Sequence, residues 1–307
     1  MVNVALLGCG RWGSNHLRTL ARLRDSGIVG KISVVDISET VRNQAELADF
    51  TATNIDDVDA DLVIIATPSN LHSKQAIEMI RKGKHVLVEK PLGRSEYEAA
   101  EVISTAQENG KILTVGLLLR FHPALSIVQN MISTGKLGRI ESMRFVRRST
   151  RTPASGNNVI EALGVHGIDM VCHLMGEVEP SAINVEGDEI ESRIALEFPH
   201  GIEALIDVAW NASVESSSVT IVGSNAKIVF ELNNHETATL YKDGEEFILQ
   251  CESNYSPLEA EIRHIIQGIN AQKEGGNWTQ NPSIGAVLRG VRWTEKALAS
   301  LPHIRPH

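Results

Sequence analysis

The sequence predicts an α/β domain with a doubly wound parallel sheet, followed by an α+β domain built on an open-faced, mainly antiparallel sheet. Two observations carry this prediction. Short apolar strands alternate with helical segments up to about residue 118, and strands of alternating polarity separated by turn residues dominate afterwards. A chain of 307 residues is also long enough for two hydrophobic cores. We therefore expect one domain at residues 1–118 and a second at 119–307.

In the first domain, each expected strand is a short apolar run bounded by polar or turn residues. These strands are Val2–Leu7, Ile32–Val35, Leu62–Ala66, His85–Val88 and Ile112–Val115. Amphipathic segments lie between them, which is typical of a parallel sheet covered by helices. Ligands of such sheets bind beyond the carboxyl ends of the strands, so the residues that follow each strand are the candidates for function.

The glycine-rich segment GCGRWG, Gly8–Gly13, closes the first strand and opens a helix. Gly8 permits a tight turn, Gly10 lets the backbone approach a phosphate, and Gly13 lets the helix pack closely on the strand. The N-terminus of that helix then attracts the anion. The glycines could instead only make a turn, but Asp36 ends the second strand where a carboxylate meets the adenosine ribose. The sequence thus predicts a Rossmann dinucleotide site that prefers NAD to NADP.

Further cofactor contacts are expected from residues around this turn and after the third and fourth strands. For Asn70, a plain strand-to-helix cap is the alternative explanation. Arg42 lies six residues after Asp36, which we expect to be too far along the helix to replace it. The expected cofactor-binding residues are Gly8, Gly10, Arg11, Trp12, Gly13, Asp36, Thr67, Pro68, Asn70, His72, Glu89 and Lys90.

The second domain is expected to contain one large sheet, with helices at about Asn157–Met175, Pro257–Gly275 and Ser283–Leu301. Along Ile202–Trp210 one side is wholly apolar and the other partly so, which favours a homodimer or homotetramer formed through the sheet. The expected strands are Ser142–Ser149, Ser181–Glu186, Ser192–Phe198, Ile202–Trp210, Ser218–Val222, Lys227–Leu232 and Thr237–Tyr241.

Composition excludes several classes of protein. A net charge of -9 lacks the basic footprint of a nucleic-acid-binding protein. The apolar runs are too short to span a bilayer, and the N-terminus goes directly into a strand without the pattern of a signal peptide, so we expect a cytoplasmic protein without a membrane partner. Three widely spaced cysteines, Cys9, Cys172 and Cys251, argue against a disulfide framework or a thiolate zinc site.

Two groups of residues can carry chemistry. Lys90 follows the fourth strand in the triplet Glu89-Lys90-Pro91, from which it could reach the nicotinamide; alternatively, it is a solvated lysine paired with Glu89. The bond before Pro91 could be cis, which would fix the direction of the lysine. In the helix near residue 170, His166, Asp169 and His173 fall within an arc of roughly 60°. We expect this stripe to line a pocket.

Asp169 and His173 are spaced so that the carboxylate can touch and orient the imidazole, which is a usual general-base arrangement. Two histidines and a carboxylate could also bind a metal, although we expect no metal here.

On these residues the chain resembles the family of glucose-fructose oxidoreductase, inositol 2-dehydrogenase and related sugar dehydrogenases. The resemblance covers nearly the whole length and implies a Rossmann domain, an open-faced sheet domain and a substrate between them. It also implies catalytic roles for Lys90, Asp169 and His173. Many members have a carboxylate where Gly167 stands, so the pocket edge departs from the family pattern there. The markers are GCGRWG, Glu89–Pro91, Arg120–Pro123, Gly135–Gly138 and Gly164–His173.

We expect an NAD(P)-dependent oxidoreductase that moves a hydride between nicotinamide and a ring hydroxyl carbon of a sugar, with NAD preferred to NADP. Histidine, with an ordinary pKa of about 6.5, makes His173 the expected base, while Lys90 stabilises the alkoxide. Lys90 is the alternative base, if burial and cationic neighbours lower its pKa. Asp169 would orient His173 or hold a neighbouring hydroxyl.

The substrate is expected to be phosphorylated or nucleotide-linked, because four arginines lie where the second domain begins: Arg120, Arg147, Arg148 and Arg151. The alternatives are surface or subunit-contact arginines, with inositol or a free sugar as substrate, and an NAD-dependent glycoside hydrolase, a non-catalytic nucleotide sensor, or an amino-acid or imine reductase. The expected substrate-binding residues are Lys90, Arg120, His122, Arg148, Arg151, His166, Asp169 and His173.

Overall fold

The fold was analysed in a computed structural model that describes residues 1–153, 156 and 158–301. The chain forms two compact units, each discontinuous in sequence. Unit 1 contains residues 1–118 and 258–291, and unit 2 contains residues 119–257 together with the chain from 292 onward. This division differs from the continuous one expected from the sequence, because part of the C-terminal chain returns to the first unit.

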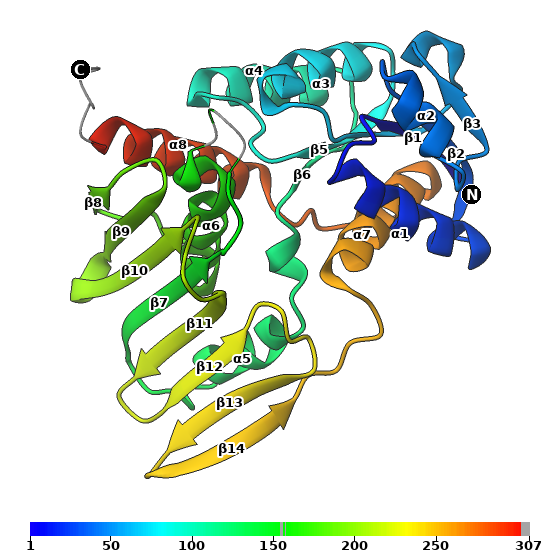
Figure 1. The fold of residues 1–307 in the computed structure, drawn as a ribbon. Helices are drawn as coiled ribbons and strands as arrows, with labels where there is room; N and C mark the ends of the chain where they lie inside the picture. The colour runs from blue at the N-terminus through cyan, green and yellow to red at the C-terminus, as the bar shows by residue number, and fades with distance from the viewer. Residues whose placement is uncertain (154–155, 157, 302–307) are drawn as a thin grey trace, which may run out of the picture. The chain divides into compact units, whose positions relative to one another are not determined.

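Unit 1 is built on a fully parallel six-stranded sheet in the order β3-β2-β1-β4-β5-β6 (Figure 1). This is the doubly wound arrangement that the sequence predicted. The strand β3 was missed because it has only three residues, of which Phe50 and Thr51 are exposed. The strands are β1 (Val2–Leu7), β2 (Val29–Val35), β3 (Phe50–Ala52), β4 (Leu62–Ile65), β5 (His85–Glu89) and β6 (Leu113–Gly116).

Helices cover both faces of this sheet and bury two apolar layers. On one face, α3 and α4 contribute Met79, Ile80 and Val102 to the core. On the other face, Leu17 and Leu20 of α1 belong to the same core as the isoleucines of α7, and α1 and α7 lie side by side in Figure 1. The helices of this unit are α1 (Gly13–Asp25), α2 (Glu39–Gln44), α3 (His72–Arg81), α4 (Glu96–Glu108) and α7 (Pro257–Glu274).

Unit 2 contains an eight-stranded sheet in the order β14-β13-β12-β11-β7-β10-β9-β8 (Figure 1). It is mainly antiparallel, as predicted, with one exception: β7 and β10 pair in parallel. The edge strand β14 was missed although it contains the apolar residues Phe247, Ile248 and Leu249, and the structure leaves nearly all of it exposed. The strands are β7 (Ile140–Arg148), β8 (Ala182–Gly187), β9 (Glu191–Phe198), β10 (Ile202–Ala209), β11 (Ser216–Gly223), β12 (Lys227–Glu231), β13 (Thr237–Lys242) and β14 (Glu245–Gln250).

The helix α6 (Val165–Leu174) packs against the centre of this sheet, on β7 and β10. Gly167 is the contact residue, because a Cβ there would lie 2.6 Å from Ile206 and 2.8 Å from Phe145. Gly167 therefore faces the sheet rather than the edge of a pocket. A π-helical turn, Ile160–Gly164, leads into α6. The predicted start of this helix, at Asn157, lies outside the described residues.

Two further helices complete unit 2. The first is α5 (Ala124–Ser133), which buries Leu125 and Val128. The second is α8 (Ile284–Ser300), whose residues up to Val291 belong to unit 1 and whose last turns belong to unit 2. Among the described residues, no helix combines the length and the hydropathy that a bilayer crossing requires.

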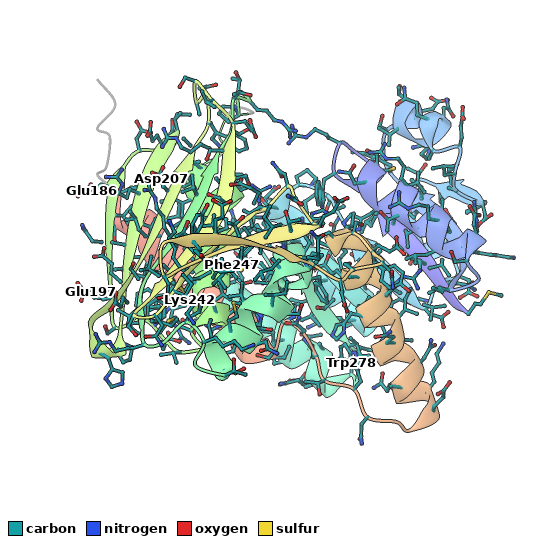
Figure 2. All side chains as sticks on the ribbon, turned by 90° about the horizontal axis from the view of Figure 1, so that it is seen from below. Glu186, Glu197, Asp207, Lys242, Phe247 and Trp278 are labelled. Atoms are coloured by element: carbon teal, nitrogen blue, oxygen red, sulfur yellow. The ribbon has the colours of Figure 1, made fainter. Side chains whose placement is uncertain are left out.

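The face of the second sheet opposite α6 carries charged side chains in place of a helix. Asp207 projects from β10 on this face and accepts Arg148 Nη1 at 2.6 Å and Arg144 Nη2 at 3.2 Å. Arg148 also donates to Glu191 at 2.7 Å. Figure 2 shows Asp207 among the side chains of the sheet in unit 2.

Candidate active site

In unit 1, the turn after β1 has the backbone shape that a dinucleotide phosphate requires. Gly8 has φ +88 and donates its N–H to Val35 O at 2.9 Å. A Cβ on Gly13 would collide with the Gly8 carbonyl oxygen, so a glycine is needed where α1 begins. A Cβ on Gly10 would meet nothing within 4 Å. The space above Gly10 and the first amides of α1 can therefore receive a phosphate.

Asp36 lies at the end of β2, next to this turn. Its Oδ2 accepts the Cys9 N–H at 2.9 Å and its Oδ1 accepts the Ser38 N–H at 2.9 Å. A carboxylate oxygen can accept a second hydrogen bond, so both oxygens can still accept ribose hydroxyls. Arg42 donates to the Asp36 carbonyl oxygen at 2.6 Å. The short helix α2 thus turns the Arg42 side chain back to the end of β2, where it bonds the Asp36 backbone and does not take the place of the Asp36 carboxylate.

Glu89, at the carboxyl end of β5, is buried and bonded to the glycine-turn region. Its Oε1 accepts the Trp12 indole N–H and lies 2.7 Å from His16 Nε2. Although burial acts to raise it, the hydrogen bonds from His16 and Trp12 hold the pKa of Glu89 below its usual range. The opposing residue on β6 is Gly116, where a Cβ would lie 2.8 Å from Glu89 Oε2. The Glu89 carboxylate thus bonds Trp12 and His16, and His16 was missed by the sequence analysis.

His72 contacts both the loop after β4 and the loop after β5. Its Nε2 lies 2.9 Å from Thr67 O and its Nδ1 lies 2.9 Å from Pro91 O, and the ring is 2% exposed. Lys90 is half-buried in the second loop, and the Lys90–Pro91 bond is cis. Pro68 and Asn70, like Arg11 in the glycine turn, are exposed. His72 therefore positions this loop, while the exposed residues remain open to a ligand.

In unit 2, a buried arginine organises the residues of α6. Arg120 Nε lies 2.8 Å from Asp169 Oδ2, and Arg120 Nη2 lies 2.6 Å from Asp169 Oδ1. The two side chains are 1% and 4% exposed. Arg120 also donates from Nη1 to Glu177 at 2.7 Å. Despite burial, the charges of Asp169 and Glu177 raise the pKa of Arg120, so the cation is fixed at all relevant pH values.

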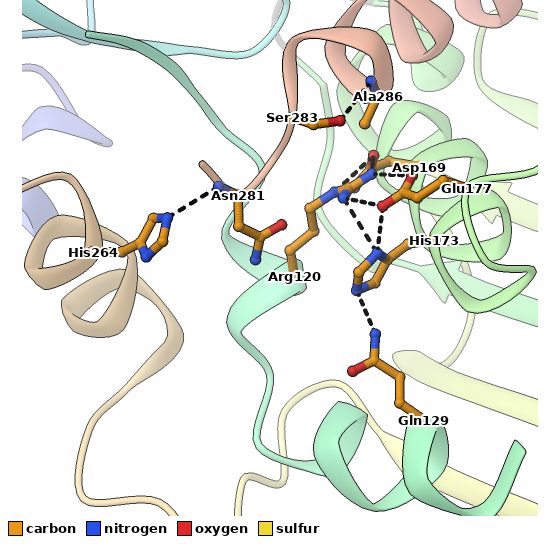
Figure 3. Close-up of polar contacts among 9 residues, drawn as sticks. All are labelled: Arg120, Gln129, Asp169, His173, Glu177, His264, Asn281, Ser283 and Ala286. Atoms are coloured by element: carbon orange, nitrogen blue, oxygen red, sulfur yellow. Dashed lines mark hydrogen bonds and ion pairs between the residues drawn. The ribbon is translucent and has the colours of Figure 1, made fainter. Parts of the chain in front are cut away.

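His173 is held by residues other than the one predicted from the sequence. Its Nδ1 lies 2.8 Å from Glu177 Oε1, and its Nε2 lies 2.9 Å from the amide nitrogen of Gln129 on α5 (Figure 3). No Asp169–His173 hydrogen bond occurs among the contacts drawn there; Asp169 accepts from Arg120 instead. The prediction that Asp169 contacts and orients the His173 ring therefore differs from the structure, in which Glu177 makes that contact. The sequence analysis missed Gln129 and Glu177, although Glu177 is four residues after His173 and could have been considered.

The other predicted substrate residues lie in different surroundings. His166 is buried in α6, at 5% exposure. His122 is 2% exposed and packs on Phe230 and His235, with ring centroids 5.1 and 5.2 Å away. Burial, and then the neighbouring His235, lower the pKa of His122 to about 4, so it is neutral near pH 7. His122 is thus a buried neutral residue rather than an open ligand contact.

The two arginines predicted to bind substrate also differ. Arg148 is engaged by Asp207 and Glu191 on the charged sheet face, whereas Arg151 is exposed. Burial, and then the charge of Arg151, lower the pKa of Arg147. Within the part of the chain that the structure describes, no group of three or more His, Cys, Asp or Glu side chains is arranged to hold a metal ion.

Comparison with known proteins agrees with this architecture. Residues 2–117 match the model of the oxidoreductase family with an NAD-binding Rossmann fold, and residues 126–229 match the C-terminal domain of GFO/IDH/MocA proteins. The chain belongs to the GFO/IDH/MocA family of oxidoreductases. Membership gives this chain an NAD-binding Rossmann domain and places it among oxidoreductases.

Individual GFO/IDH/MocA relatives are distant. Inositol 2-dehydrogenase 2 of Saccharopolyspora erythraea is 28% identical over 184 residues, which is 57% of this chain and 54% of the relative, so the chain spans about half the length of that enzyme. A levoglucosan dehydrogenase in complex with NADH and levoglucosan has a TM-score of 0.81 at 20% identity, covering 97% of this chain and 96% of that one.

A second solved structure is KijD10, a 3-ketoreductase from Actinomadura kijaniata in complex with NADP and TDP-benzene. It has a TM-score of 0.83 at 17% identity and covers 97% of both chains. At these identities the two structures show the shared fold alone.

Proposed function

We propose that this chain oxidises or reduces a sugar at a ring hydroxyl carbon, with NAD as the hydride carrier. NAD, when bound, supplies the nicotinamide that takes or gives the hydride. The observation that carries the proposal is the His173 cluster, formed by Arg120, Gln129, Asp169, His173 and Glu177, in a member of an NAD-binding oxidoreductase family. In this cluster the His173 imidazole contacts the Glu177 carboxylate, which is itself paired with Arg120, and this arrangement suits a general base.

In this proposal the residues divide the work. His173 accepts the hydroxyl proton at Nε2 as the hydride leaves, and the Lys90 ammonium stabilises the developing alkoxide. Asp169 holds Arg120 in place, and Arg120 in turn bonds the Glu177 carboxylate that contacts His173. The first strand-turn-helix of unit 1 holds the pyrophosphate, and Asp36 accepts from the ribose hydroxyls, which disfavours a 2′-phosphate and favours NAD.

The proposed substrate carries a phosphate or nucleotide group. Arg120 and Arg148 are each paired with two carboxylates, so they do not support this assignment. Arg147 does, because it is half-buried and repelled by Arg151, and among residues 1–153 and 158–301 it forms no ion pair. An anion near both guanidinium groups would relieve that repulsion.

The function is tested by measuring NAD reduction with UDP-sugars, sugar phosphates, inositol and free hexoses. We expect the highest kcat/KM with an anionic sugar, and a loss of at least about 10-fold in Arg147→Met. If inositol or a free hexose reacts best and Arg147→Met leaves kcat/KM unaltered, the anionic substrate is wrong and the dehydrogenase proposal stands. If none of these sugars reduces NAD or NADP, the dehydrogenase proposal is wrong.

The charged sheet face is proposed to contact a second copy in a homo-oligomer, and the protein is proposed to act in the cytoplasm. Apolar side chains such as Leu205 and Ile248 lie among the charges of this face, with Ile248 65% exposed. Light scattering gives the mass in solution. A dimer or tetramer that dissociates in Leu205→Arg supports the contact, and a monomer at all concentrations contradicts it.

A further inference from the structure

Glu177 occupies its place because of the way α6 ends. Gly176 has φ +75 and Glu177 has φ +66, so two successive residues are left-handed. The Glu177 N–H donates back to Cys172 O at 2.9 Å, and the Gly176 N–H donates to His173 O at 3.1 Å. This termination folds the chain over the last turn of the helix. It brings the Glu177 side chain beside His173 although Glu177 lies outside the helix.

The contacts of His173 Nδ1 decide where its proton resides. Nδ1 lies 2.8 Å from Glu177 Oε1 and 3.2 Å from Arg120 Nη1. A guanidinium can only donate and a carboxylate can only accept. Nδ1 can therefore bond to Glu177 only when it carries the proton, and to Arg120 only when it carries the lone pair.

One proton arrangement satisfies all of these groups. If Nδ1 donates to Glu177, Arg120 Nη1 can donate to the same carboxylate, from which it lies 2.7 Å. The lone pair is then at Nε2, where the amide nitrogen of Gln129 lies at 2.9 Å and can donate to it. With the opposite tautomer, Nε2–H would face the amide N–H of Gln129 and Glu177 would lose one donor. Figure 3 shows the chain of contacts from Arg120 through Glu177 and His173 to Gln129.

We propose that Glu177 is a positioning residue that selects the Nδ1–H tautomer of His173 and so makes Nε2 the basic atom, with the Gln129 amide occupying that lone pair until a substrate hydroxyl replaces it. This inference rests on the proposed role of His173 as the base. Asp169 cannot do the same work, because its oxygens accept three bonds from Arg120 at 2.6 to 3.0 Å.

The first test needs no substrate. Nitrogen NMR of ¹⁵N-histidine protein at pH 8.5 reports which ring nitrogen carries the proton, and the His173 signals are those absent in His173→Gln. We expect Nδ1–H in the wild type. In Glu177→Ala, Arg120 is the remaining partner of Nδ1 and can only donate, so Nε2–H should dominate. Nε2–H in the wild type, or an unchanged tautomer in Glu177→Ala, overturns the proposal.

Conservative variants separate the tautomer from the fold. Glu177→Gln keeps an oxygen that can accept from Nδ1–H, so it should retain the wild-type tautomer while Glu177→Ala loses it. If Glu177→Ala does not fold, Glu177→Leu in its place is compared with Glu177→Gln by the same spectrum. Gln129→Ala touches only the other nitrogen and should keep Nδ1–H. A tautomer change in Gln129→Ala would assign the selection to Gln129 and overturn the proposal.

Kinetics give the second readout. With the substrate found in the NAD reduction screen, Glu177→Ala should lose at least about 10-fold in kcat at neutral pH, because the base presents the wrong nitrogen. Glu177→Gln should recover most of this loss, with the acidic limb of the pH–rate profile moved to lower pH because the negative charge is gone. Glu108→Gln, an exposed change at the end of α4, is the matched control and should match the wild type. If the tautomer changes as expected but the rate does not, His173 is not the base, and that role in the proposed function fails while the tautomer assignment stands.

Discussion

Arg120 and Asp169 form a forked ion pair in which both side chains are almost completely buried, with Nη2 2.6 Å from Oδ1. Removing one partner of such a pair leaves an uncompensated charge, which commonly costs about 3–5 kcal/mol. In Asp169→Asn, Glu177 still accepts from Arg120 at 2.7 Å, so we expect the free energy of unfolding to fall by somewhat less, about 2–3 kcal/mol, measured by urea denaturation. Arg139→Ala removes an 80% exposed arginine that lies 3.7 Å from Glu141 and should cost less than about 0.5 kcal/mol. Equal losses in the two variants would contradict the importance of burial.

Replacing Lys90 by Met should separate binding from turnover. The lysine charge is needed most when the alkoxide forms, and donors of this type commonly contribute about 10²-fold to the rate. We expect kcat to fall by about that factor while the Kd for NADH changes less than about 3-fold. Lys136→Met, an exposed change elsewhere, serves as the control. A Lys90→Met enzyme that keeps more than about a tenth of its turnover would remove the lysine from the mechanism.

Cofactor choice should depend on the charge of Asp36. We expect the wild type to bind NADH at least about 10-fold more tightly than NADPH, because a carboxylate repels a 2′-phosphate. In Asp36→Asn the one remaining oxygen keeps the bond from either Cys9 N–H or Ser38 N–H, the charge is lost, and Arg42 is already 2.6 Å from the residue's carbonyl. The ratio of NADPH to NADH dissociation constants should then fall, or drop below one. Fluorescence titration with both cofactors measures it, and Asp25→Asn, at an exposed position, should change nothing. Tighter NADPH binding by the wild type would contradict the assignment.

His85 should make unit 1 less stable in mild acid. Burial, and then the charges of Lys111 and Lys273, lower the pKa of His85 to about 4, and its Nδ1 accepts the Ile112 N–H at 3.1 Å. Since the unfolded chain binds the proton near pH 6.5 and the folded chain does not, the stabilisation is complete above pH 6.5 and is lost as the pH falls from 6.5 to 4. The loss should reach about 3 kcal/mol at pH 4, since each unit of pKa difference corresponds to about 1.4 kcal/mol.

The variant His85→Asn keeps an acceptor for Ile112 and removes the titration. Urea denaturation at pH 7.5 and 4.5 should therefore show a smaller pH-dependent loss in His85→Asn than in the wild type. His200→Asn, at an exposed turn, is the comparison. Identical losses in wild type and His85→Asn would mean that other groups set the acid sensitivity.

The sequence predicted most elements of the fold because the strands that carry it are strongly patterned. Val2–Leu7 is nearly continuous in apolar residues, and residues 202–208 place an apolar residue at every second position. The missed strands β3 and β14 lack the alternation of a half-buried strand: β3 has three residues, and the apolar residues of β14 stand in one run, 247–249, on a strand that is almost wholly exposed. The parallel pairing of β7 with β10 was not predictable either, because strand pattern does not encode which distant strand is the partner.

The site was harder to predict because helical spacing gives two equivalent answers. His173 has carboxylates at both i−4 and i+4, namely Asp169 and Glu177. What decides between them is Arg120, which is 49 residues before Asp169 and takes its carboxylate. Gln129, on α5, is likewise brought to Nε2 by tertiary packing alone. No local pattern reports such partners, so the residue types were predictable and their pairing was not.

The place of α7 in unit 1 has a consequence for biosynthesis. Ile262, Ile265 and Ile269 are 0% exposed in the core that also contains Leu20 and Leu23 of α1. A ribosome that has released residues 1–118 has therefore made every strand of the first sheet and α1, but not α7, which shares the core on that face with α1. The α7 part of this core is complete only after about 150 further residues have been synthesised. Until α7 has been synthesised, the nascent chain exposes apolar side chains of this core, and we expect chaperones to bind it at this stage.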